Sequence, residues 1–363
     1  MRRELRTCPA DASREVKDTL VEAFRRAVRD GRPDVGTEHL LFALLGGDSA
    51  AKDLLAPRAR DSGSLMGVIT AKGAEHWAGE DRSGESPGCR TAAALLREAA
   101  WTASRDEAPP RPTGALTAAL AQALKQAESL GVSRANTSHL LMGLLHDPGN
   151  RACEALLERR MDRGDLIDRL AVHPSAHQDG TERPDALSGL RNMGMLTERG
   201  MYWGRLARTL SGGGFGSPVV LTVRKEAERQ AVRLGHSEVT EVHLLLGMLV
   251  LDDQLSEAGL SLRPEWAGVN RGAELLRRRG VTLASVVDAL AEPDTAVPFR
   301  PTMHEDIERI LTRARLRCHE RKDPSTGTDH LLAVLVADPG GPCESLLTSH
   351  GVDSEELRQA LEN

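Results

Sequence analysis

One ten-residue phrase constrains this chain more than any other feature, because it occurs four times. Each copy has a short polar start, a histidine and then a run of leucines and other apolar residues. The copies occupy residues 36–45, 136–145, 240–249 and 327–336, and their histidines are His39, His139, His243 and His330. Repetition on this scale predicts a repeat protein, in which each copy belongs to one structural unit and neighbouring units pack together.

The residues around each copy predict four helices per repeat. Before the first copy, apolar residues recur at intervals of three and four along residues 13–29, which is the helical period. Leu40, Leu41 and Leu44 then give the helix of the phrase a broad apolar face, so we expect it to be the buried centre of its unit. Thr37 is expected to cap this helix through its hydroxyl. Two shorter helices follow, and the other copies repeat the pattern.

The repeats predict an all-α protein of two domains, each a pseudo-twofold pair of four-helix repeats. One repeat buries little surface by itself, so the first copy should pack on the second and the third on the fourth. Residues 173–215 are rich in Gly, Pro, Ser and charge and are interpreted as a linker; within it, residues 195–210 could form a helix whose Tyr202 and Trp203 dock on a neighbour. The predicted boundaries are 1–172 for the first domain, with repeats at 13–75 and 113–172, and 216–363 for the second, with repeats at 216–292 and 299–363.

Composition narrows the class of protein. Aromatic residues make up 2% and hydrophobic residues 40%, so the cores must be built from Leu, Ala, Val and Met, which favours helix packing. The net charge of −6 argues against a nucleic-acid binder. Five scattered cysteines without a Cys-x-x-Cys pair support neither a disulfide framework nor a zinc site, and suit a reducing cytoplasm. Neither a signal peptide nor a membrane span is expected from the hydropathy.

The repeated phrase resembles the Clp N-terminal repeat. Gly36-Thr37-Glu38-His39 followed by a leucine-rich helix and a short Ala/Leu helix carries the resemblance, which covers roughly residues 13–172 and 216–363. The resemblance implies the all-helical, substrate-receiving domain at the front of Clp-type AAA+ unfoldases, especially of the ClpC kind. The sequence has no Gly-x-x-x-x-Gly-Lys-Ser/Thr loop to hold nucleotide phosphates. We therefore expect two receiving domains in tandem without the motor, with no cofactor and no catalytic activity.

For ClpC-like domains the resemblance implies that the acidic residue of the phrase binds phosphoarginine. A carboxylate can accept from the guanidinium N–H groups, and backbone donors at a helix start can receive the phosphoryl oxygens. The residues that match are Thr37 and Glu38 in the first copy and Thr328 and Asp329 in the fourth; the second copy has Ser138 and the third has Val242 at the acidic position. The alternative is that Glu38 and Asp329 are ordinary first-turn charges that suit the helix dipole.

The four histidines invite a metal or catalytic interpretation, but each lies at a helix start without a second histidine at metal-binding spacing. A partly buried histidine that fixes the loop is the expected role. Cys153 and Cys343 lie at similar points of their repeats and are expected to be core residues rather than nucleophiles. We expect no metal site and find no catalytic constellation in the local spacing.

A second site is implied by the resemblance, on the leading helix of the fourth repeat. In ClpC-like proteins a phenylalanine before this helix and residues of its first turns help to form a groove for peptides and cyclic-peptide antibiotics. The matching residues here are Phe299, Pro301, His304, Ile307, Glu308 and Leu311, with His304 in place of the lysine that is usual in the family. The alternative is that Phe299 fills the core between the third and fourth repeats.

These observations favour a binding function. One hypothesis is a decoy that sequesters ClpC-targeting cyclic peptides, or phosphoarginine-marked or hydrophobic peptides. The other is an adaptor that docks on the ClpC unfoldase and changes substrate delivery. An enzyme that reuses the fold is disfavoured by the missing constellation, and a DNA-linked regulator by the acidic charge balance.

Overall fold

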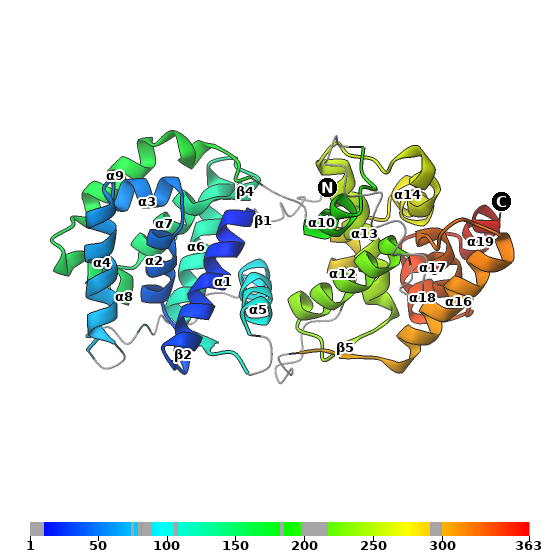
Figure 1. Cartoon of the computed structure of the whole chain (residues 1–363), viewed down its shortest axis with the longest axis horizontal. Helices are drawn as coiled ribbons and strands as arrows, with labels where there is room; N and C mark the ends of the chain where they lie inside the picture. Colours follow the sequence, from blue (N-terminus) through cyan, green and yellow to red (C-terminus); the bar gives the residue numbers. More distant parts are fainter. Residues whose placement is uncertain are drawn as a thin grey trace, which may run out of the picture. The chain divides into compact units, whose positions relative to one another are not determined.

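Helices make up nearly all the regular structure of this chain (Figure 1). The computed structural model describes residues 11–73, 76–78, 81, 89–104, 108–181, 185–197, 217–290 and 300–362. The chain divides into two units, Met1–Arg183 and Pro184–Asn363, and each holds two of the four repeats. The predicted all-α fold is confirmed, since the strands are only two residues long.

The first unit pairs the first repeat with the second. The first repeat comprises α1 (Arg14–Arg29), α2 (Thr37–Gly46), α3 (Ala50–Leu55) and α4 (Ala59–Lys72), and the second comprises α6 (Gly114–Ser129), α7 (Thr137–His146), α8 (Arg151–Glu158) and α9 (Arg163–Val172). An additional helix, α5 (Arg90–Ala103), packs on α1 and α6. Both leading helices begin at a hydroxyl cap, because Ser13 accepts from Val16 N and Thr113 from Leu116 N.

Short parallel strands join the two repeats of the first unit reciprocally. β1 (Asp11–Ala12) pairs with β4 (Arg134–Ala135), and β2 (Asp34–Val35) pairs with β3 (Arg111–Pro112). In each pair, the strand before the leading helix of one repeat lies beside the strand before the central helix of the other. This exchange gives the unit its pseudo-twofold character, and it brings the start of α2 close to the start of α6.

The second unit is built in the same way from the third and fourth repeats. The third repeat comprises α12 (Pro218–Leu234), α13 (Glu241–Glu257), α14 (Arg271–Arg278) and α15 (Leu283–Ala289), and the fourth comprises α16 (Glu305–Arg321), α17 (Thr328–Leu335), α18 (Pro342–Ser349) and α19 (Ser354–Glu362). β5 (Glu238–Val239) pairs with β6 (Thr302–Met303). The 3₁₀ helix η2 (Pro264–Asn270) lies between α13 and α14 in the chain.

The central helices are buried on nearly all sides, and two of them meet their leading helices at backbone distance. A Cβ on Gly143 would stand 2.1 Å from the carbonyl oxygen of Ala119, and one on Gly247 would stand 2.4 Å from that of Val223. Only glycine fits at these two crossings, so the residue four positions after the histidine sets how closely the helices approach.

Parts of the segment predicted as a linker instead pack on the two units. The 3₁₀ helix η1 (Pro174–His177) lies against α7 and α9 of the first unit. In the second unit, α10 (Asp185–Asn192) packs on α12 and α13, and Leu187 and Leu190 are fully buried. The Gly- and Pro-rich composition of the whole segment predicted a linker, but apolar side chains at helical spacing within it allow parts of it to pack. Tyr202, Trp203 and most of the helix expected over 195–210 lie outside the described residues.

Candidate functional site

The start of α2 brings together residues from both repeats of the first unit. Gly36 is the N-cap residue, and Thr37 is the first residue of the helix. The hydroxyl of Thr37 donates to Asp81 Oδ1 at 2.8 Å and accepts from the backbone N–H of Ala152 at 3.1 Å. The predicted capping role of Thr37 was therefore wrong, because its hydroxyl is used for contacts between segments rather than within its own helix.

Glu38 is buried, and it forms an ion pair that its local sequence does not indicate. Its side chain is 3% exposed, and Oε1 accepts from Arg151 Nη1 at 3.0 Å. Its second oxygen, Oε2, is buried without a hydrogen-bond partner. Burial raises the pKa of Glu38 to about 7, and the neighbouring Asp81 adds to the rise although Arg151 opposes it. Glu38 is thus more than a solvated first-turn charge.

The four repeated histidines share one structural role. In every copy Nδ1 accepts from the backbone N–H of the N-cap residue, at 3.1 Å for His39, 3.1 Å for His139, 2.9 Å for His243 and 3.0 Å for His330. The proton of the neutral ring must then be on Nε2. Burial lowers the pKa of His39 and of His243 to about 4. The predicted loop-fixing role is confirmed.

Cys153 and Cys343 are buried in the cores of their units. Burial raises the pKa of the Cys153 thiol to about 11 and that of Cys343 further still. Thiols held protonated in this way are poor nucleophiles, so the predicted core role is confirmed.

A cavity of about 250 Å³ opens beside Glu38, among α1, α2 and α4. Charged and apolar side chains line it together: Arg26, Asp30, Arg32, Glu38, His39, Phe42, Ile69 and Thr70, with Gly73. The Arg26 guanidinium lies 4.3 Å above the Phe42 ring and donates to Asp30 at 2.7 Å. Arg32 donates to Asp34 at 3.2 Å, but its Nε is buried without a hydrogen-bond partner. The lining thus contains one unmet donor and one unmet acceptor.

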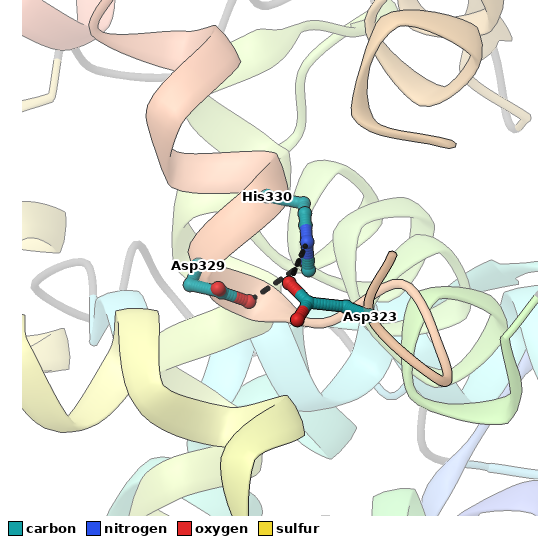
Figure 2. Close-up of side chains that lie close together, drawn as sticks. All are labelled: Asp323, Asp329 and His330. Carbon is teal, nitrogen blue, oxygen red and sulfur yellow. Dashed lines mark hydrogen bonds and ion pairs between the residues drawn. The ribbon is translucent and has the colours of Figure 1, made fainter. Parts of the chain in front are cut away.

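The corresponding acidic residue in the fourth repeat has different interaction partners. Asp329 is buried at the start of α17, and its Oδ2 lies 3.5 Å from Arg321 Nη1 at the end of α16. His330 Nε2 donates to Asp323 Oδ2 at 2.9 Å. Figure 2 shows the side chains of Asp323, Asp329 and His330 close together. Burial would raise the pKa of Asp329, but contacts with His330 and Arg321 outweigh it and hold the pKa below its usual value.

Asp323, Asp329 and His330 could each offer a ligand atom to a metal ion, with these atoms within 4.8 Å of one another. Arg321, however, already contacts both carboxylates, at 3.0 Å from Asp323 and 3.5 Å from Asp329. The acidic charge is compensated by this guanidinium, and His330 Nδ1 is used by the backbone N–H of Gly327. The cluster is therefore best described as an ion-pair network that fixes the start of α17.

The residues proposed for a peptide groove separate into two groups. Ile307 is fully buried and Leu311 is 1% exposed, and both belong to the core of the second unit, so they do not line a surface groove. The helical period that suggested a shared face marked the inward face of α16. Glu308 is exposed and pairs with Arg224 at 3.0 Å, while His304 caps α16 by accepting from Asp306 N. Pro301 is half-buried, and Phe299 lies outside the described residues.

Sequence reasoning missed the partners that define the first-unit site. Arg151 is the first residue of α8, and it reaches Glu38 across 113 positions of the chain. Asp81 lies between the first two repeats and binds Thr37 across 44 positions. No local signal marks either residue, because both act through the packing of one repeat on the other.

The fold and these buried helix starts define an all-α protein of tandem repeats paired within each unit. Residues 302–363 match the family model described as the Clp repeat (R) N-terminal domain. Residues 302–363 are therefore a Clp N-terminal repeat, as the repeated phrase predicted.

Two relatives show the extent of the similarity. The chain is 31% identical over 135 residues to the chaperone protein ClpB of Streptomyces albus G, a stretch that is 37% of this chain and 13% of that protein. It is 24% identical over 135 residues to the negative regulator of genetic competence ClpC/MecB of Bacillus subtilis, covering 37% of this chain and 15% of that protein. The match therefore spans a small part of each relative. Among the described helices, none is long and apolar enough to cross a membrane.

Proposed function

We propose that this chain is a non-catalytic ligand-binding protein of the Clp system, whose first unit takes a peptide side chain carrying both a guanidinium group and an anionic group. Phosphoarginine is the example of such a side chain. One observation carries the proposal: Glu38 and Arg32 line the same cavity, and each holds a buried polar atom, Oε2 and Nε, without a hydrogen-bond partner. Unmet buried groups cost free energy, which a ligand that satisfies both would recover.

The chemistry of the two groups is complementary to that ligand. Glu38 Oε2 can accept from guanidinium N–H groups, while Oε1 stays with Arg151. Arg32 Nε can donate to a phosphoryl oxygen. Because the pKa of Glu38 is about 7, a cationic guanidinium binds best to the ionised form, and affinity should rise as the pH rises through 7. We do not propose an enzyme role: Ser175 Oγ lies 2.7 Å from His173 Nδ1, but this contact belongs to the cap at the start of η1.

In its biological role the chain would act as a decoy. Repeats similar to those of ClpB and ClpC/MecB would compete for the same ligands, whether phosphoarginine-marked peptides, hydrophobic peptides or ClpC-targeting cyclic peptides. For cyclic peptides, the half-buried N-cap His304 of α16 and the exposed Glu308 on its first turn, together with Phe299, remain the candidate contacts in the second unit.

A second candidate function is an adaptor that docks on a ClpC-type unfoldase. The observation that favours it is the exposure of two apolar side chains at the ends of consecutive helices in the first unit, Leu157 of α8 at 73% and Val172 of α9 at 80%. Exposed aliphatic residues of this kind suit a protein contact.

Calorimetric titration of the full chain with a phosphoarginine peptide tests the proposal, with the unmodified arginine peptide as the ligand control. We expect Glu38→Gln to weaken binding at least tenfold, and wild-type affinity to be higher at pH 8 than at pH 6. Asp329→Asn is the matched control variant and should bind like the wild type. Unchanged affinity in Glu38→Gln would reject the site.

Adding the unfoldase then separates the two roles. A decoy lowers degradation of marked substrates without binding the unfoldase, whereas an adaptor forms a complex that Leu157→Ser weakens.

A further inference from the structure

Asp81 is a buried carboxylate held by donors from three helix starts. It is 3% exposed, and its backbone is left-handed with a φ of 53°. Its oxygens accept from Thr37 N and Thr37 Oγ1, both at 2.8 Å, from Thr113 Oγ1 at 2.7 Å and from Arg151 N at 3.3 Å. We call these four donors the Thr37 cradle.

The cradle has the composition of an anion-binding site. Thr37 is the first residue of α2, Thr113 is the N-cap of α6, and Arg151 is the first residue of α8. Three helix N-termini therefore converge, and each contributes partial positive charge and an N–H or O–H donor. Four donors from different directions can be used more fully by a tetrahedral oxyanion than by a planar carboxylate.

A second observation points to a ligand at the same place. Glu38 Oε2 is buried without a partner, and it lies 2.0 Å from the point where a Cβ on Gly36 would stand, while Asp81 Oδ2 lies 2.8 Å from that point. An unmet acceptor thus stands next to an anion held by the cradle. The start of α7 is built differently, because there the side-chain oxygen of the N-cap residue Asn136 accepts from Ser138 N at 2.9 Å.

We propose that the Thr37 cradle is a phosphate-class anion site that the chain's own Asp81 carboxylate fills, so that Asp81 competes with the phosphoryl group of a ligand. The cradle itself does not depend on the proposed function, but the competition rests on it. With Asp81 displaced, the phosphoryl group would leave Arg32 for the cradle, while Glu38 Oε2 keeps the guanidinium as in the proposed function. Removing Asp81 should leave four donors unmet, and an added oxyanion should restore them.

Thermal unfolding of the full chain tests the cradle with inorganic phosphate as the probe. Asp81→Ala should lose stability in potassium chloride and regain several degrees of Tm in potassium phosphate of equal ionic strength, beyond the general salting effect that the wild type shows. Asp179→Ala is the matched control, because Asp179 also accepts backbone N–H groups, from Ser133 at 2.7 Å and Arg134 at 2.9 Å, but on the exposed surface of the same unit. Asp81→Gly also empties the cradle and suits the left-handed backbone at this position, and it is the variant to use if Asp81→Ala does not fold. An equal phosphate effect in all the proteins would overturn the proposal.

Titration with the phosphoarginine peptide tests the competition. Asp81→Ala or Asp81→Gly should bind it about tenfold more tightly than the wild type, and adding Glu38→Gln should remove the gain. Equal affinity with and without Asp81 would overturn the competition while leaving the proposed function intact. Phosphate rescue without any phosphoarginine binding would support the cradle and reject the proposed function.

Discussion

The starts of α2 and α17 carry the same motif, Gly-Thr followed by an acid and a histidine, yet their acids are in opposite electrostatic states. Glu38 pairs with Arg151 from the neighbouring repeat, and its pKa is raised to about 7. Asp329 pairs with Arg321 from the leading helix of its own repeat, and its pKa is lowered. Burial acts on both carboxylates, so the difference comes from their neighbours.

The cause lies in which charges the two packings bring together. In the first unit Asp81 adds a second carboxylate beside Glu38, and this opposes the effect of Arg151. In the second unit the position that corresponds to Arg151 is Gly272, where a Cβ would stand 2.4 Å from the Thr328 carbonyl oxygen. The helix start of the fourth repeat is therefore closed by backbone contact, whereas that of the first repeat is closed by charged side chains. Each acid keeps one buried oxygen without a hydrogen-bond partner, Glu38 Oε2 and Asp329 Oδ1, and Glu38 lines the cavity of about 250 Å³ described above.

The largest difference should appear when each arginine is removed. Arg151→Met leaves a buried carboxylate without its main partner, and we expect a loss of about 4 kcal/mol at pH 8. Arg321→Met should cost only about 1 kcal/mol, because Arg321 is 32% exposed and lies farther from its carboxylate. Hydrogen exchange of the α2 and α17 amides in the full chain measures the two losses separately. Equal losses would show that the two helix starts do not differ in how strongly they depend on their arginines.

The pH dependence should sharpen the contrast. Between about pH 4.5 and 7, folded Glu38 holds a proton that the unfolded chain has released, so its contribution to stability falls as the pH rises through this window. Glu38→Gln should therefore gain on the wild type across the window, by up to about 3 kcal/mol. The stabilisation from Asp329 is instead present above its unfolded pKa and lost only when acid protonates it, so the difference between Asp329→Asn and the wild type should stay constant from pH 5 to 8. Urea unfolding of both variants checks this. Parallel curves for Glu38→Gln and the wild type would count against the buried, raised carboxylate.

A smaller effect should distinguish the two modes of closure. Gly272→Ala places a methyl group against the backbone of Thr328 and Asp329, and we expect a loss of about 2 kcal/mol in the second unit. Gly268→Ala is the matched control, since nothing lies within 4 Å of a Cβ at that position. Thermal unfolding of the two variants gives the comparison. A Gly272→Ala variant as stable as Gly268→Ala would show that the helix start is not closed by backbone contact.

Much of the helical architecture could be predicted from local sequence. The leading helix of the first copy, predicted over residues 13–29, is α1 (Arg14–Arg29), and all but the first residue of the second copy of the phrase lies in α7 (Thr137–His146). The helical period of apolar residues fixes such elements locally. The candidate groove was less predictable, because the same period placed Ile307 and Leu311 on one face without showing whether that face was inward.

By itself, the sequence determined the four repeats, their helices and the loop-fixing role of the histidines, since all of these depend on contacts between residues a few positions apart. Only the tertiary structure decided that Glu38 meets Arg151, that Asp81 fills the Thr37 cradle and that Asp329 is paired within its own repeat. Those contacts form between segments far apart in the chain, and their energies depend on burial and on the sum of nearby charges, neither of which is set by local residue order.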